Sequence, residues 1–284
     1  MTMSTDPKPL ISIIVAVYNG ARTLQQCIDS VVHQTYLNRE LIIIDGGSKD
    51  GTAEILTENS DKINYSLSEP DQGIYDAWNK ALVRARGEWI CFLGADDYLW
   101  DADVLEKLIP HLAPAQKATR IVYCQSVMVD IEGNELARLG RPWPEIKRQF
   151  PYVMGIPHPA TFYHRTVFAS HGKFDTSFRI AGDFEFLLRE LRSADALFVP
   201  GIVTTGMQHG GISSAGRNSL SVLKEMRIAQ RKHGYAIPGA KWVMAYIRVR
   251  LRLCLWTCIG KNRSAGLLDW GRRITGRGPF WTRI

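Results

Sequence analysis

The first hundred residues alternate between short apolar runs and longer segments in which apolar residues recur every three or four positions. The runs predict strands at residues 11–18, 41–45, 63–68 and 88–93. The first run is continuous and rich in β-branched residues, which is typical of a parallel strand buried on both faces. The segments between the runs predict helices, including one over residues 75–86. This alternation predicts an α/β protein with a single central, mostly parallel sheet and helices on both faces.

The pattern changes after Arg120. Residues 121–130 and 135–139 predict two strands of a hairpin, with a turn at residues 132–134. Five prolines then indicate a stretch rich in loops, at positions 142, 144, 151, 157 and 159. Further along, we expect helices over residues 180–192 and 220–232 and a strand over residues 197–204.

Charge divides the chain into an acidic body and a basic tail. The composition, 45% hydrophobic and 22% charged, is that of a folded protein, and the net charge is +7. Fourteen of the 35 basic residues but only two of the 28 acidic ones lie from Lys224 onward, so this segment carries +12 and the remainder −5. Such asymmetry indicates that the tail meets an anionic partner.

The tail also contains aromatic residues, which suit an anionic membrane surface. Nucleic acid is the competing partner, but the acidic body disfavours it, and we expect no nucleic-acid binding. Packing of the tail on the body is a third possibility. Residues 248–253 alternate between basic and apolar types, so the pattern does not require a helix there.

Targeting signals are not evident in this sequence. The first twenty residues lack the basic and apolar regions of a signal peptide. The most apolar stretch, residues 242–259, contains Arg248, Arg250 and Arg252, which disfavours a membrane span. Five cysteines without a CxxC pair fit a reducing compartment. We therefore expect a cytoplasmic protein, bound peripherally to the inner face of the cytoplasmic membrane.

Two neighbouring carboxylates, Asp96 and Asp97, follow the fourth predicted strand. Ligands of an α/β sheet bind beyond the carboxyl ends of its strands, where the second predicted strand also places Asp45. Paired carboxylates at such a position favour Mn²⁺ or Mg²⁺, which would offset the charge of a diphosphate leaving group. Alone, an Asp-Asp pair is more often a solvated turn or a helix cap.

Two loops at the same edge are candidates for donor binding. Gly46 and Gly47 follow Asp45 and allow a close backbone approach to a ligand, or they form a plain turn into the next helix. The sequence contains neither GxGxxG nor GxxxxGK[ST], so it has no dinucleotide fingerprint and no P-loop. Tyr18 ends the first strand, where it could stack on a nucleobase or cap the sheet edge.

Four later residues have two interpretations each. Asp183 could remove a proton from an acceptor hydroxyl or cap a helix. The glycine-rich stretch 206–216, with His209 and the following Arg217, could be a lid over the diphosphate or a surface loop. His158, between two prolines, could line the acceptor side or be structural.

Taken together, these motifs resemble the family 2 glycosyltransferases of the GT-A fold. The resemblance covers about residues 10–215 and rests on SIIVAVYN (12–19), QTY (34–36), ELIIIDGGSKDGT (40–52), residues 81–90 and LGADD (93–97). The segment SEPDQGIYDAWN (68–79) is similar to a bacterial exopolysaccharide and colanic-acid-type branch. The resemblance implies a catalytic domain at 1–220, with a nucleotide-binding half (1–100) and an acceptor-binding half (101–220), before a basic amphipathic tail (221–284).

The resemblance also implies an inverting, metal-dependent transfer from a nucleotide-diphosphate sugar to a glycan or lipid-linked oligosaccharide, in surface polysaccharide synthesis. It makes Asp97 the more direct metal ligand, with Asp96, and Asp183 the general base. Donor-binding positions are Ala16, Tyr18, Asp45, Gly73 and Asp96.

This sequence departs from the family pattern at two positions. Many members have an acid at the position of Gly46 and an arginine at that of Trp78. UDP is the expected donor nucleotide, and GDP and dTDP stay open. A sugar-phosphate nucleotidyltransferase and a non-catalytic nucleotide-sugar-binding scaffold are the alternatives; the first normally needs a basic Gly-rich loop after its first strand, which is absent here.

Overall fold

The computed structural model describes residues 8–211, 216–274, 276 and 278–283. Its strands are β1 (Ile11–Val17), β2 (Arg39–Asp45), β3 (Tyr65–Ser68), β4 (Trp89–Gly94), β5 (Asp97–Leu99), β6 (Ile121–Val129), β7 (Glu135–Leu139), β8 (Thr161–His164) and β9 (Leu197–Gln208). Its helices are α1 (Leu24–Val32), α2 (Thr52–Glu58), α3 (Ile74–Leu82), α4 (Val104–Ala118), α5 (Trp143–Ile146), α6 (Thr166–His171), α7 (Gly182–Leu191), α8 (Ser219–Lys232), α9 (Ala240–Ile259) and α10 (Lys261–Ile274), with short 3₁₀ turns η1 (His158–Ala160) and η2 (Gly216–Asn218).

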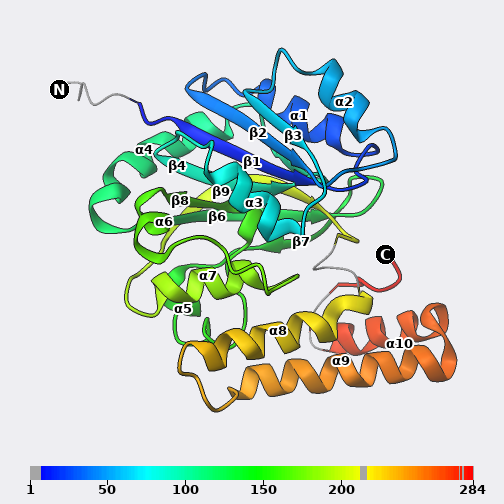
Figure 1. Ribbon diagram of the computed structural model, residues 1–284. Coiled ribbons are helices and arrows are strands. Elements are labelled where there is room, and N and C mark those ends of the chain that lie inside the picture. The colour runs from blue at the N-terminus through cyan, green and yellow to red at the C-terminus, as the bar shows by residue number, and fades with distance from the viewer. Residues whose placement is uncertain (1–7, 212–215, 275, 277, 284) are drawn as a thin grey trace.

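The described strands form one sheet in the order β3-β2-β1-β4-β8-β6-β9-β5, with β7 paired to β6 (Figure 1). The first four strands in this order are parallel, as the alternating pattern predicts. The other half is mixed, because β8 runs antiparallel to both of its neighbours and β5 runs antiparallel to β9. The predicted α/β class is confirmed, while the parallel arrangement is limited to β3-β2-β1-β4 and the β6–β9 pair.

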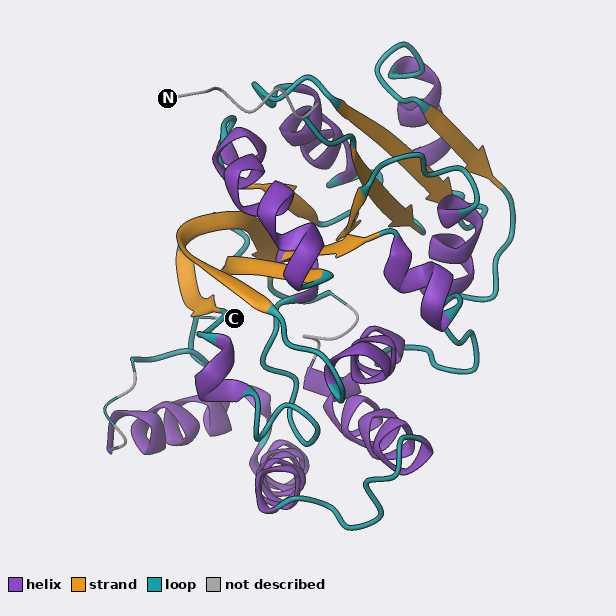
Figure 2. Ribbon diagram, turned by 90° about the vertical axis from the view of Figure 1, so that its left-hand side faces the viewer, coloured by secondary structure: helices purple, strands orange, loops and turns teal. Residues whose placement is uncertain are grey.

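Helices cover both faces of the sheet (Figure 2). Successive side chains of a strand point to opposite faces. Accordingly, Ile14 and Ala16 of β1 pack in the core beneath α3, α7 and α8, whereas Ile13 and Val15 pack in the core beneath α1 and α4. Because both faces are buried, the sequence of β1 is continuously apolar and shows no alternation.

The C-terminal segment forms a helical layer beside the body. α8 packs against α7, α9 packs against α8, and α10 packs against α9, at the lower margin of the molecule in Figure 1. The alternating residues 248–253 are part of one 20-residue helix, α9. Among the described residues, no helix is both long enough and apolar enough to cross a membrane. The division of the chain at residue 220 stays a prediction.

Candidate active site

The ends of three parallel strands bring the predicted donor-binding residues to one edge. In the register of the sheet, Val17 lies beside Asp45, and Ala16 lies beside Gly94. Tyr18 follows directly after β1, and 68% of its surface is exposed. This edge therefore combines an exposed aromatic ring with the carboxylates that follow β4.

The carboxylates of Asp96 and Asp97 converge on Gly94. A Cβ atom at position 94 would lie 2.6 Å from Oδ1 of Asp96 and 3.1 Å from Oδ2 of Asp97, so a larger residue there would displace these carboxylates. The Gly94 N–H donates a hydrogen bond to Oδ2 of Asp97 at 2.9 Å. Asp97 is the first residue of β5, which the sequence pattern does not predict.

These two carboxylates lack a cationic partner among the described residues, where neither forms an ion pair. Burial raises the pKa of Asp97 well above its usual range, and the charge of Asp96 raises it further. Burial also raises the pKa of Asp96. A divalent cation would relieve this cost, because a nearby positive charge favours the ionised form.

Two carboxylates alone are fewer ligands than a complete metal coordination sphere needs. Within the described part of the chain, no cluster of three or more His, Cys, Asp or Glu side chains could hold a metal ion. Mg²⁺ and Mn²⁺ sites that bind phosphates commonly use one or two carboxylates, with phosphate oxygens and water completing the sphere. Asp96 and Asp97 fit this type of site.

Asp45 organises the loops at this edge. Its fully buried carboxylate accepts hydrogen bonds from the backbone and hydroxyl of Ser48 and from the hydroxyl of Ser68 at 2.6 Å. The Asn19 N–H donates to Oγ of Ser48 at 2.7 Å, and the Asn19 side chain accepts from the Lys49 N–H. In this structure, then, the Asp45 carboxylate ties the loop after β2 to the end of β3, and Asn19 joins the loop after β1 to Ser48 and Lys49. The predicted role of Asp45 in donor binding stays a prediction.

Asp71 is a candidate residue that the sequence analysis does not single out. A Cβ atom at Gly46 would lie 2.6 Å from Oδ2 of Asp71, so this carboxylate occupies the space that a larger residue at position 46 would fill. Oδ1 of Asp71 accepts the Gly73 N–H at 2.8 Å. Gly73 has φ +121°, which favours glycine. Burial raises the pKa of Asp71.

Asp183 lies in the first turn of α7 and is half-buried. Ala181 occupies the N-cap position, so the helix-cap interpretation of Asp183 is wrong. Oδ1 of Asp183 accepts the Phe184 N–H at 2.8 Å and the Tyr75 hydroxyl at 3.3 Å. Gly182 permits this contact, because a Cβ atom there would lie 2.8 Å from the Tyr75 ring. Burial is the largest influence on Asp183 and raises its pKa to about 6.

The backbone before α7 is held by Glu225 of α8. Its carboxylate accepts N–H groups from Arg179 (3.1 Å), Ile180 (2.8 Å) and Ala181 (2.9 Å). A glutamate more than forty residues away along the chain therefore satisfies the amides that lead into the helix of Asp183. No local sequence signal marks this contact.

His158 is buried within an aromatic cluster. Its ring stacks on Trp78 at 4.8 Å between centroids and lies 5.7 Å from Phe92 of β4. Burial lowers the pKa of His158 to about 3, so its ring is neutral, and Nε2 has no hydrogen-bond partner among the described residues. This position fits the structural interpretation of His158 better than an exposed acceptor contact.

The predicted lid stretch begins beside the carboxylate pair. Met207 of β9 pairs with Asp97, and the backbone N–H of His209 donates to Val129 O. The His209 ring packs edge-on against Phe280 of the tail at 5.6 Å. Residues 212–215 and the side chain of Arg217 lie outside the described part of the chain, so the lid stays a prediction.

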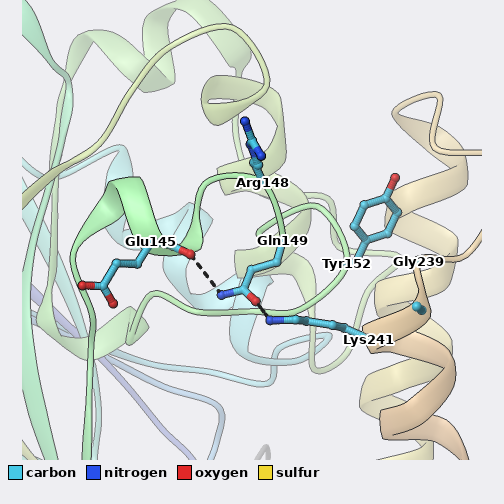
Figure 3. Close-up of a pocket in the computed structure, with 7 residues that line it drawn as sticks. Glu145, Arg148, Gln149, Tyr152, Gly239 and Lys241 are labelled. Atoms are coloured by element: carbon cyan, nitrogen blue, oxygen red, sulfur yellow. Dashed lines mark hydrogen bonds between the residues drawn. The ribbon is translucent and has the colours of Figure 1, made fainter.

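A cavity of about 370 Å³ lies between the segment after α5 and the start of α9 (Figure 3). It is lined by Glu145, Arg148, Gln149, Tyr152, Gly239, Ala240 and Lys241. Gly239 allows close packing here, because a Cβ atom would lie 2.5 Å from the Tyr152 ring. None of the predicted donor-binding or catalytic residues lines this cavity.

Comparisons with known proteins identify similar glycosyltransferases. A PGL/p-HBAD biosynthesis glycosyltransferase of Mycobacterium bovis BCG is 30% identical over 211 residues, which cover 72% of this chain and 80% of that relative. An uncharacterised glycosyltransferase of Mycobacterium tuberculosis is 29% identical over 252 residues, covering 85% of this chain and 91% of the relative.

Two solved structures share the fold at low sequence identity. Staphylococcus aureus TarS is 16% identical, with a TM-score of 0.62; the match covers 90% of this chain but only 46% of TarS. The mannosyltransferase PcManGT from Pyrobaculum calidifontis, solved with GDP-Man and Mn²⁺, is 18% identical, with a TM-score of 0.59 and coverages of 97% and 84%.

The fold and the family evidence define a glycosyltransferase of the GT-A type. The model of glycosyl transferase family 2 matches residues 12–174, and the chain belongs to this family. The family assignment therefore decides against the nucleotidyltransferase and the non-catalytic scaffold.

Proposed function

We propose that this glycosyltransferase acts by an inverting, metal-dependent transfer from a nucleotide-diphosphate sugar. The observation that carries the proposal is the Asp96–Asp97 pair, two converging carboxylates without a described cationic partner at the ends of parallel strands. Bound Mn²⁺ or Mg²⁺ would neutralise charge on the diphosphate leaving group. PcManGT, which shares the fold, was solved with GDP-Man and Mn²⁺, which supports this assignment.

Asp183 is the proposed general base. Its carboxylate would accept the proton of the acceptor hydroxyl as the hydroxyl oxygen attacks the anomeric carbon and the bond to the diphosphate breaks. Attack from the face opposite the leaving group inverts the configuration. The raised pKa of Asp183, about 6, makes it a stronger base than an ordinary aspartate while leaving it ionised at neutral pH.

Asp71 and Tyr18 are the proposed contacts to the nucleobase. Oδ1 of Asp71 is used by the Gly73 N–H, and the structure describes no hydrogen bond to Oδ2. A carboxylate oxygen can accept the imide N–H of uracil or thymine, or the N–H groups of guanine. We propose UDP as the donor nucleotide, with GDP and dTDP as competitors, because a TarS structure contains UDP-GlcNAc and PcManGT contains GDP-Man.

We also propose that the acceptor is a glycan or lipid-linked oligosaccharide in surface polysaccharide synthesis, and that the enzyme works peripherally on the inner face of the cytoplasmic membrane. The basic tail supports this placement. A relative named for PGL/p-HBAD biosynthesis supports a role in glycan synthesis.

A thermal-shift panel of UDP-, GDP- and dTDP-sugars, with and without Mn²⁺, tests the donor site. The wild type should be stabilised by one nucleotide class in a Mn²⁺-dependent manner. Asp97→Asn should lose the Mn²⁺-dependent part of the shift, since it removes a charged ligand. Asp71→Asn should keep the Mn²⁺ dependence but weaken nucleotide binding by about tenfold or more, because one charge-assisted hydrogen bond is lost.

Asp61→Asn is the matched control for that panel, because Asp61 is exposed and lies before β3, at the opposite end of this strand from Asp71. It should bind donors as the wild type does. Full Mn²⁺ dependence in Asp97→Asn would contradict the metal site. If none of the nucleotide sugars stabilises the wild type, the donor assignment is wrong.

A further inference from the structure

The inner face of α9 packs on the body of the protein. Its contacts with the core are made by Trp242, Ala245, Tyr246 and Val249. Arg252, one turn further, donates to Ser219 Oγ at 2.6 Å and lies over the rings of Trp256 and Trp281. Because successive helix positions are about 100° apart, these residues lie on one side of α9.

The opposite side of α9 carries an apolar stripe that faces solvent. Its members are spaced by three and four residues: Met244, Ile247, Leu251, Cys254 and Cys258. Met244, Ile247 and Leu251 keep 51%, 50% and 61% of their surface exposed, and both cysteines are exposed. An apolar row opposite the packed face contributes nothing to the described core, which indicates a binding partner.

The charges beside the stripe have one sign. Helical geometry places Arg248 on one side of the stripe and Arg250 on the other, and both are exposed. The sequence of α9 contains four basic residues and no acidic residue. Helix α10 adds exposed apolar side chains, Leu267, Trp270 and Ile274, beside Arg273.

We propose that this outer face of α9 binds the surface of an anionic membrane, with the stripe in the interfacial region and the arginines on lipid phosphates. An amphipathic helix in the plane of the interface has this arrangement of apolar and basic residues. A second copy of the chain fits less well, because a symmetric contact would bring arginine rows of the same charge together.

The order in which the helices pack places this surface relative to Asp183, the proposed base. α9 packs on α8, and α8 packs on α7, which carries Asp183. The membrane surface therefore lies on the α7 side of the sheet and is separated from α7 by the α8–α9 layer. The surface rests on the proposed peripheral placement at the membrane and names the face that makes the contact, but it does not depend on the proposed donor chemistry.

Flotation of the full-length protein with vesicles tests the proposal. Wild type should float with vesicles of phosphatidylcholine and phosphatidylglycerol, bind pure phosphatidylcholine at least about tenfold more weakly, and be released by salt. The double variant Ile247→Glu/Leu251→Glu should bind the anionic vesicles about 100-fold more weakly, because it places two carboxylates in the stripe.

The matched control, Leu37→Glu/Val83→Glu, makes the same kind of change at exposed apolar residues of the body, and it should bind vesicles as the wild type does. Thermal unfolding and donor binding of each variant report folding and the donor site separately, so loss of vesicle binding with intact donor binding supports this surface alone. Unchanged vesicle binding by the stripe variant would overturn the proposal. So would a wild-type dimer that the stripe variant converts to a monomer while vesicle binding stays the same.

Discussion

At the scale of single residues, Asp183 provides a pH-dependent test of the proposed chemistry. Burial raises its pKa to about 6, although hydrogen bonds from the Phe184 N–H and the Tyr75 hydroxyl oppose the rise. A general base acts in its ionised form, so kcat should increase with pH through about 6 and then level off. Asp183→Asn should lower kcat by about 10²-fold or more and leave donor affinity largely unchanged.

Tyr75→Phe provides the control for this assignment. Because the Tyr75 hydroxyl lowers the pKa of Asp183, its removal should move the rising limb of the kcat profile to higher pH. Initial rates at saturating donor across about pH 5–8 measure the limb. A flat profile in the wild type, or substantial activity in Asp183→Asn, would show that Asp183 is not the base.

At the scale of elements, the contact between α8 and the start of α7 positions the base. Glu225 accepts three backbone N–H groups before α7, and its charge raises the pKa of Asp183. Glu225→Ala should therefore lower kcat by about tenfold or more, as expected when a catalytic group loses its alignment. It should also move the rising limb to lower pH, opposite to Tyr75→Phe, which a purely structural defect would not do.

Glu58→Ala, at an exposed residue of α2, is the matched control for the α8 contact and should behave as the wild type. Steady-state kinetics and thermal unfolding distinguish positioning from loss of folding. Partial rescue in Glu225→Gln, which keeps one acceptor oxygen but not the charge, would agree with a positioning role. An unchanged kcat and pH profile in Glu225→Ala would contradict it.

The sequence predicts the elements that follow one periodicity and misses those set by distant contacts. The buried runs of β1, β2 and β4 are predicted to within two residues at each end. β8 and η1 are missed, because Pro157 and Pro159 indicate loop, whereas pairing with β4 and β6 makes a strand of the residues that follow. The sequence does not predict helix α9, because residues 248–253 alternate between basic and apolar types with a period of two. Packing of α9 on the core nevertheless holds these residues in a helix.

In the candidate site, too, the sequence predicts what depends on local pattern and misses what depends on distant contacts. Asp96 and Asp97 are predictable, because their position depends only on where β4 ends. The hydrogen bonds of Asp45 to Ser48 and Ser68 and the position of the Asp71 carboxylate beside Gly46 depend on how distant loops meet, so the sequence does not predict them.

At the scale of the whole molecule, the tail should be part of the cooperative fold. Trp242 and Tyr246 pack on the core, and the buried guanidinium of Arg227 donates to the carbonyl of Tyr235 at 2.7 Å. Truncation after Lys232 removes these contacts and the bond from His233 to the buried Glu185. It should lower the free energy of unfolding by roughly 3 kcal/mol or more, because it removes two partly buried aromatic side chains and the hydrogen-bond partners of buried Arg227 and Glu185.

Truncation after Gly260 is the control, because it removes α10 and keeps the contacts of Trp242, Tyr246 and Val249 of α9 with the core. Chemical denaturation should show one transition for the full chain, a small loss after Gly260 and a large loss after Lys232. Equal stability of all three chains would show that the tail is an independent module. The longer truncation weakens the fold together with any lipid contact, so it cannot separate the two effects. Membrane binding is therefore tested at the outer face of α9, where Ile247 and Leu251 can be changed without disturbing the core.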